Sequence, residues 1–196
     1  MIDSLEGTLT SKSPGLAVIE VAGVGFEVHV PLSTFAALPE PGQRVRILTH
    51  LHLSAMQESE LKLFGFATEA ERRLFRGLMG VHGVGPTKAM KMLSSCPVED
   101  FTRYVMAGDV KALATLVKGV GKKTAQQLVL DLRGELAEED TQAEFAAIHP
   151  AAADVVKALV SLGTNPADAR KSVEKALKKL GPDADPETLM REALSS

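Results

Sequence analysis

The sequence has little cysteine for disulfide bonds and few of the larger aromatic residues: it has no tryptophan, one tyrosine and one cysteine in 196 positions. The lone Cys96 excludes an internal disulfide and favours a reducing cytoplasm. No run of about 18 apolar residues is present, so no transmembrane helix is expected. The N-terminus also lacks the basic and apolar regions of a signal peptide. We therefore expect a cytoplasmic protein without a membrane partner.

The formal net charge of −3 is unevenly distributed along the chain. Residues 1–64 hold 4 basic and 7 acidic residues, and residues 135–196 hold 7 and 12. Residues 65–134, by contrast, hold 11 basic and 6 acidic residues. A basic middle between two acidic ends predicts a polyanionic partner for the middle segment alone.

The fold class predicted is multidomain α+β, and its first part, residues 1–65, is predicted to be an OB-type β-barrel. Short branched runs such as "GLAVIEV", "GFEVHV" and "ELKLFGF" indicate strands, with a turn at Ala22–Gly25. In "RVRILTHLHL" one face carries Val45, Ile47, Leu51 and Leu53, and the other Arg44, Arg46, His50 and His52. "PLSTFAALPEPG" predicts a short helix with Ser33 as its N-cap. Five or six strands with one short helix suit a small closed barrel.

From residue 66 to 136 the period of the apolar pattern becomes helical. Thr68 and Glu71 form a capping-box pattern, which predicts a helix start. The predicted helices cover residues 69–80, 86–94, 97–106, 109–117 and 121–136. This segment is predicted to be an all-α domain.

The remainder is predicted to be a linker followed by a small helical domain. Residues 137–151 are acidic and alanine-rich with little periodicity, which predicts a flexible linker. Asn165 and Asp185 each precede a proline, a cap-and-start pattern. The predicted three-helix domain spans residues 152–196, with helices at 152–162, 166–180 and 186–194.

The helical middle contains an internal repeat. A shift of 36 positions brings Gly83-Val84-Gly85 onto Gly119-Val120-Gly121, each followed by a predicted helix and by lysines. The turn and the first turn of the helix expose N–H groups, and the helix dipole adds positive charge there. Such a place suits a phosphate and reads no base. The predicted phosphate-binding residues are Gly83, Val84, Gly85, Thr87, Lys88, Lys91, Gly119, Val120, Gly121, Lys122, Lys123 and Thr124.

Other glycine-rich sites fit less well. A P-loop needs glycine where Leu116 stands, and a dinucleotide fingerprint needs glycine where Thr124 stands. The alternative is a purely structural role, in which the glycines only allow two helical hairpins to pack closely.

The segments "VHGVGPTKAMKML" and "VKGVGKKTAQQLVLDL" look like the paired helix–hairpin–helix motifs of DNA-binding proteins. With "MIDSLEGTL", "VAGVGFEVHVP" and "LFGF", the whole layout resembles the RuvA family, the Holliday-junction-binding subunits of the bacterial branch-migration machine. The resemblance implies a homotetramer or octamer that holds a four-way junction open and flat. It also implies two protein partners, the hexameric ATPase RuvB at the C-terminal domain and the RuvC resolvase.

The resemblance further implies an acidic pin on a hairpin of the barrel, for which the candidates are Glu58 and Glu60. These two acids are separated by Ser59 in a loop longer than the family's usual turn, and they could instead be ordinary solvated residues. For the ATPase surface the candidates are Leu159, Leu162 and Leu189, against the alternative that each leucine belongs to a three-helix core.

No cofactor, metal or catalytic site is predicted. His50 and His52 share a strand face, but zinc needs further ligands and the only cysteine is remote. The rival hypothesis is a helix–hairpin–helix glycosylase or nuclease. Its catalytic acid would fall near Asp131, which is predicted to lie within a helix and face solvent.

Overall fold

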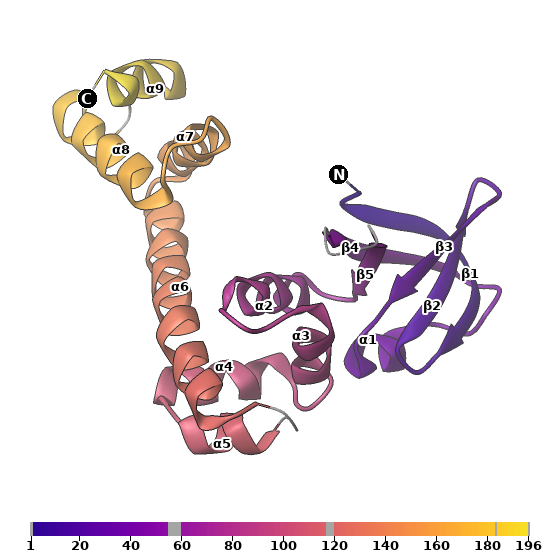
Figure 1. The fold of residues 1–196 in the computed structure, drawn as a ribbon. Coiled ribbons are helices and arrows are strands. Elements are labelled where there is room, and N and C mark those ends of the chain that lie inside the picture. The colour runs from indigo at the N-terminus through magenta and orange to yellow at the C-terminus, as the bar shows by residue number, and fades with distance from the viewer. Residues whose placement is uncertain (1, 55–59, 117–119, 183, 196) are drawn as a thin grey trace. The chain divides into compact units, whose positions relative to one another are not determined.

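The computed structural model describes the backbone of residues 2–54, 60–116, 120–182 and 184–195, and the side chains of these residues except 54, 60, 135–144 and 147. The chain divides into two compact units, Met1–Gly134 and Glu135–Ser196 (Figure 1). The first unit holds a barrel and a set of helices, and the second is entirely helical.

The barrel has five strands: β1 (Ser4–Ser13), β2 (Leu16–Val21), β3 (Val24–His29), β4 (Arg44–Ser54) and β5 (Glu60–Phe66). Their order around the closed sheet is β1-β2-β3-β5-β4. All pairs are antiparallel except β3 with β5, which meet at His29 and Phe64. The short helix α1 (Leu32–Ala37) lies between β3 and β4 in the chain. This arrangement confirms the predicted OB-type barrel.

Two glycines allow the barrel to close. A Cβ atom at Gly65 would lie 2.5 Å from the Val28 side chain and 2.6 Å from that of Ile47. At Gly7 it would lie 2.1 Å from the carbonyl oxygen of Glu20 on the neighbouring strand. Only glycine permits these approaches without movement of the neighbours. The buried residues that fill the barrel are Leu5, Leu9, Ala17, Ile19, Val28, Val30, Leu38, Ile47 and Leu63.

The turn between β2 and β3 is shorter than predicted. Ala22 and Gly23 both have positive φ, 51° and 83°, so a two-residue turn joins the strands. That geometry is typical of tight hairpins. Val24 and Gly25 already belong to β3, so the last two residues of the predicted turn are part of the strand.

The predicted N-cap of α1 is wrong. Pro31 occupies that position and its side chain forms no cap hydrogen bond. The Ser33 hydroxyl instead donates to the Glu71 carboxylate, a tertiary partner that local sequence could not reveal.

The helices of the first unit are α2 (Glu69–Gly80), α3 (Pro86–Leu93), α4 (Val98–Ala107), α5 (Val110–Leu116) and the start of α6 (Lys122–Ile148). Thr68 accepts from the Glu71 amide at 3.2 Å, and the Glu71 side chain accepts from the Thr68 amide, which confirms the capping box. The predicted boundaries of α2 to α5 hold to within one residue at each end.

The structure differs from the prediction over residues 137–151. The backbone is helical to Ile148, and His149 is the N-cap of the next helix, so this segment is not an irregular linker. Its alanines, glutamates and glutamine are strong helix formers, which favour helix even without an apolar stripe. Phe145, placed in the linker by the prediction, is buried in the C-terminal core.

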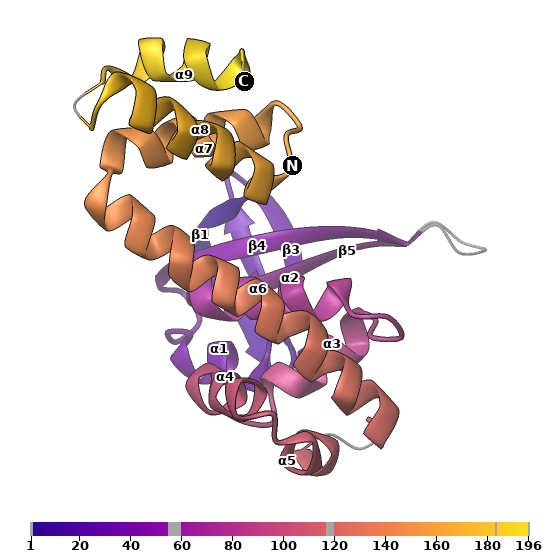
Figure 2. The ribbon, with the colours of Figure 1, turned by 90° about the vertical axis from the view of Figure 1, so that its left-hand side faces the viewer.

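The second unit contains α7 (Pro150–Ser161), α8 (Pro166–Leu180) and α9 (Pro186–Leu194) (Figure 2). Asn165 caps α8 by accepting from the Ala167 amide at 2.9 Å. Asp185 caps α9 by accepting from two amides. Both predicted helix starts are therefore confirmed. The core residues are Phe145, Ala152, Ala153, Val155, Val156, Leu159, Ala169, Val173, Ala176, Leu189 and Ala193.

Candidate nucleic-acid interface

The first predicted hairpin is formed by α2, a five-residue turn and α3. Gly83 has a φ of +80°, a left-handed conformation that favours glycine. Gly85 is the N-cap of α3, and no side chain caps this helix. Pro86 stands at its first position, where a missing N–H leaves no bond unmade. The first amides of α3 therefore have no capping side chain, as an anion site at a helix N-terminus requires.

The second hairpin joins α5 to α6, and residues 117–119 between them lie outside the described residues. The phosphate contact predicted at Gly119 therefore lies outside the described residues. Val120 is buried, and Gly121 precedes α6, which begins at Lys122. The side chains of Lys122 and Lys123 are exposed at the first positions of that helix.

The described parts of the two hairpins agree at positions 36 residues apart. Val84 and Val120 are both 5 % exposed, and Ala89 and Ala125 are both fully buried. The Ala89 amide donates to the Gly85 carbonyl at 3.0 Å, and the Ala125 amide donates to the Gly121 carbonyl at 3.0 Å. The valine side chains thus anchor each turn in the core, and any phosphate contact there would come from the backbone.

Gly85 and Gly121 are exposed glycines that the fold itself does not require. A Cβ atom added at either position would meet no atom of the described residues within 4 Å, and neither glycine has the positive φ that favours glycine. Gly85 has a φ of −94°. The purely structural alternative therefore fails at both positions, because neither glycine is needed for two helices to pack closely. A side chain is absent where an external group would approach the helix N-terminus.

Two exposed lysines lie on α3, Lys88 near its N-terminus and Lys91 in its last turn. Lys88 is exposed, and its ammonium group donates to the Gly83 carbonyl at 2.9 Å, which holds its charge over the turn. Thr87 and Lys91 are exposed on the same helix. On α6 the predicted Thr124 is half-buried next to the two exposed lysines.

Thr87 and Lys91 also line a groove of about 470 Å³ between α3 and the barrel. His29 and Lys62 contribute basic groups from the barrel side of this groove. Neither residue was predicted from the sequence. No local signal could have found them, because His29 on β3 and Lys62 on β5 are brought together only by the parallel pairing of these strands.

The predicted acidic pin falls on the connection between β4 and β5. These strands pair from Leu48 with Phe66 to Ser54 with Glu60. Glu58 lies outside the described residues, and for Glu60 only the backbone is described, at the first position of β5. Near this end Leu53 pairs with Leu61, and both are more than 60 % exposed.

The histidines of β4 pack against rings. His50 lies edge-on to Phe75 of α2 with centroids 5.3 Å apart, and His52 lies edge-on to Phe64. Burial, followed by the nearby charge of Arg76, lowers the pKa of His50. Among the described residues no three His, Cys, Asp or Glu side chains are grouped to hold a metal ion.

Asp131, the acid weighed for an enzymatic rival, lies on α6. It accepts from the Gln127 side chain one helical turn earlier, at 2.8 Å, and is half-buried. Its carboxylate is engaged within its own helix, and the predicted solvent-facing position is only partly correct.

The candidate ATPase surface needs correction. Leu159 and Leu189 are 2 % and 0 % exposed, because α7, α8 and α9 bury them in the core of the second unit. Leu162, just after α7, is 69 % exposed and is the one member of that set available to a partner.

A closed five-stranded barrel followed by two helix–hairpin–helix units defines a class, the tandem helix–hairpin–helix proteins with an N-terminal OB-type barrel. Three family models match: "RuvA N terminal domain" over residues 1–65, "SAM-like Helix-hairpin-helix tandem" over 75–134, and "RuvA, C-terminal domain" over 150–196. The chain belongs to the RuvA family.

Curated relatives resemble the chain over nearly its whole length. The protein from Thioalkalivibrio sulfidiphilus named "Holliday junction branch migration complex subunit RuvA" is 43 % identical, covering 88 % of this chain and 89 % of its own length. The protein of that name from Syntrophobacter fumaroxidans is 42 % identical, covering 99 % and 98 %. No helix among the described residues is long and apolar enough to cross a membrane.

Proposed function

We propose that this chain binds four-way DNA junctions as the RuvA subunit of a branch migration complex. The observation that carries the proposal is the repeated hairpin. Two helix N-termini, 36 residues apart, share the same buried valine, the same buried alanine and an exposed glycine with open space around it. This geometry suits two phosphate groups of one duplex arm.

The contact proposed is with the DNA backbone, not with base edges. N–H groups at a helix start and lysine ammonium groups both complement phosphate, and neither distinguishes one base pair from another. Junctions of any sequence would then bind. The groove lined by Lys91, His29 and Lys62 extends this surface towards the barrel with two lysine ammonium groups.

The barrel supplies the feature that separates a junction from a plain duplex. We place the acidic pin at Glu58 and Glu60, on the connection between β4 and β5. Carboxylates near phosphates repel them, and the repulsion is stronger where water is partly excluded. The pin would keep strands apart at the junction centre while the hairpins hold the arms.

We assign no catalysis to this chain. ATP hydrolysis is proposed to reside in the RuvB hexamer, bound by the C-terminal domain through a surface that includes Leu162. A homotetramer, or two tetramers face to face, would present one pair of hairpins to each arm of a four-way junction. RuvC resolvase is a further proposed partner, and the proposed location is the cytoplasm, with the chromosome.

The test compares binding of the purified protein to a four-way junction and to linear duplex of the same sequence. Tighter binding to the junction is expected, and equal affinity would refute junction specificity. Cleavage of DNA or base release by the purified chain would favour the glycosylase or nuclease alternative. The double substitution Glu58→Gln with Glu60→Gln should retain junction binding, and loss of that binding would refute the pin assignment. Mass measurement with and without junction DNA would distinguish a tetramer from an octamer.

A further inference from the structure

The barrel and the hairpins are joined at one buried carboxylate. Glu71, in the first turn of α2, is 5 % exposed. It accepts hydrogen bonds from the hydroxyls of Ser33 and Thr34 on α1, the latter at 2.8 Å. It also accepts from the amides of Ala67 and Thr68, at 2.9 and 3.3 Å, where β5 leads into α2. Four donors therefore converge on one side chain.

The next residue holds the same helix to the other side of the barrel. Arg72 donates to the Asp3 carboxylate at 2.7 Å and to the Asp3 carbonyl at 3.0 Å, just before β1 begins. Its remaining N–H groups donate to Glu69 on its own helix. The Arg72 side chain is 9 % exposed, so the arginine end of this ion pair is held by burial, whereas the Asp3 side chain is 68 % exposed.

Apolar packing covers the space between these two polar contacts. The ring of Phe75 on α2 lies 4.9 Å from Phe64 and 5.0 Å from Phe66, both on β5. Ring packing of this kind stabilises the interface but tolerates sliding. Hydrogen bonds to a buried carboxylate are directional, and leaving them unmade is costly. The polar contacts therefore determine the angle at which α2 leaves the barrel.

We propose that Glu71 is a positioning residue: by tying α1 to α2 it fixes the orientation of the barrel relative to the paired hairpins, and with it the preference for a four-way junction over linear duplex. This inference rests on the proposed function, in which hairpins alone suffice to grip duplex. Discrimination of a junction requires the barrel to face its centre while the hairpins hold an arm.

The test is the double variant Glu71→Gln with Thr34→Val, which preserves shape while removing the charge and one donor. The matched control is Thr10→Val, the same change on the exposed side of the barrel, where the hydroxyl donates to the Val18 carbonyl at 3.1 Å. Affinity for duplex should stay within about 2-fold of wild type, while the ratio of junction to duplex affinity falls by roughly 10-fold or more. The control should keep the wild-type ratio.

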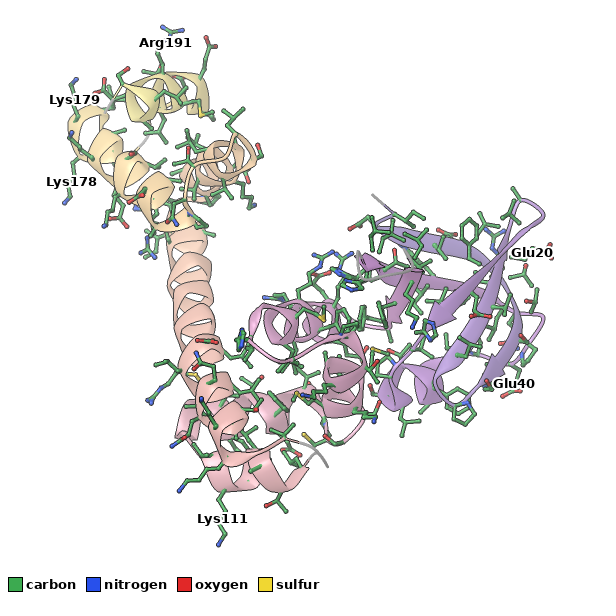
Figure 3. All side chains as sticks on the ribbon, in the orientation of Figure 1. Glu20, Glu40, Lys111, Lys178, Lys179 and Arg191 are labelled. Carbon is green, nitrogen blue, oxygen red and sulfur yellow. The ribbon has the colours of Figure 1, made fainter. Side chains whose placement is uncertain are left out.

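A second measurement reports orientation without DNA. Spin labels at Glu20→Cys on the barrel and Lys111→Cys on α5, in a Cys96→Ser background, lie on the two parts that Glu71 joins (Figure 3). Dilution with unlabelled protein removes distances between subunits. The distance distribution should broaden in the double variant and remain narrow in the control. Thr34→Val alone should show the same change to a smaller extent if the double variant folds poorly.

The outcomes separate the two hypotheses. An unchanged affinity ratio, or a reduced ratio without a broader distance distribution, would overturn the positioning role of Glu71. A wild-type protein without junction preference would refute the proposed function and the specificity half of this inference, while the spin-label distances would still test the orientation.

Discussion

The exposed glycines at the starts of α3 and α6 give the sharpest test of the phosphate-binding hypothesis. We predict that Gly85→Ala and Gly121→Ala leave the fold intact and weaken DNA binding. A Cβ atom at either position meets no part of the described chain within 4 Å, and the backbone there has no positive φ that would strain alanine. Alanine restricts the unfolded chain more than glycine does, which stabilises the folded variants, but alanine is also a poorer N-cap than glycine. Because these two effects oppose each other, the free energy of unfolding should change by less than about 1 kcal/mol.

The effect on binding follows from the position of the added methyl group. It would stand where a phosphate approaches the first amides of the helix. The loss of one charge-assisted hydrogen bond costs about 1.5–3 kcal/mol, which corresponds to roughly 10- to 150-fold weaker binding per hairpin. The double variant should lose more than either single variant, because the two sites act on the same duplex arm.

Fluorescence anisotropy with a labelled four-way junction measures the affinity, and thermal unfolding measures the fold. The matched control is Gly134→Ala on α6, where the added Cβ atom likewise has none of the described atoms within 4 Å. It should bind DNA as wild type does. Wild-type affinity in both hairpin variants would show that no phosphate reaches these helix starts and would refute the reasoning.

Three further predictions concern charge, packing and pH. Lys122→Glu with Lys123→Glu should weaken junction binding and reduce the slope of log affinity against log salt by up to about 2, measured by titration at several salt concentrations. Gly65→Ala should destabilise the protein by about 1–3 kcal/mol in urea unfolding, because side chains at 2.5 and 2.6 Å must move. The hydroxyl and amide of Thr188 lower the pKa of Asp185 below its ordinary value. Its contribution to stability is therefore present above that ordinary value and is lost as pH falls through the lower folded-state value. Asp185→Ala should accordingly flatten the loss of stability in acid, measured by thermal unfolding across that range.

Local patterns in the sequence were sufficient for most of the elements. Alternation predicted the strands, the Thr68 and Glu71 spacing predicted the start of α2, and Asn165 and Asp185 predicted the starts of α8 and α9. The capping signals work because each depends on hydrogen bonds between residues a few positions apart, and the strand signal works because successive side chains of a strand point to opposite faces. The linker prediction failed because weak periodicity was taken as absence of helix, although alanine and glutamate favour helix by themselves.

The candidate site likewise has parts that local sequence predicts and parts that it does not. The 36-residue repeat revealed both hairpins from the sequence, since each is a continuous stretch of chain. The exposures of Leu159, Leu162 and Leu189 could not be predicted, because all three occur in similar apolar patterns and only helix packing separates core from surface.

By itself, the sequence determined that a basic helical segment with two glycine-rich hairpins follows a barrel, and it predicted a backbone-phosphate site at each hairpin. Only the tertiary structure decided that Ser33 and Thr34 bind Glu71 instead of capping a helix, and that His29 and Lys62 line a groove beside α3. The physical reason is distance along the chain. In each of these three pairs, Ser33 with Glu71, Thr34 with Glu71 and His29 with Lys62, more than 30 residues separate the two members. Closure of the barrel and docking of α2, not local propensity, therefore bring them together.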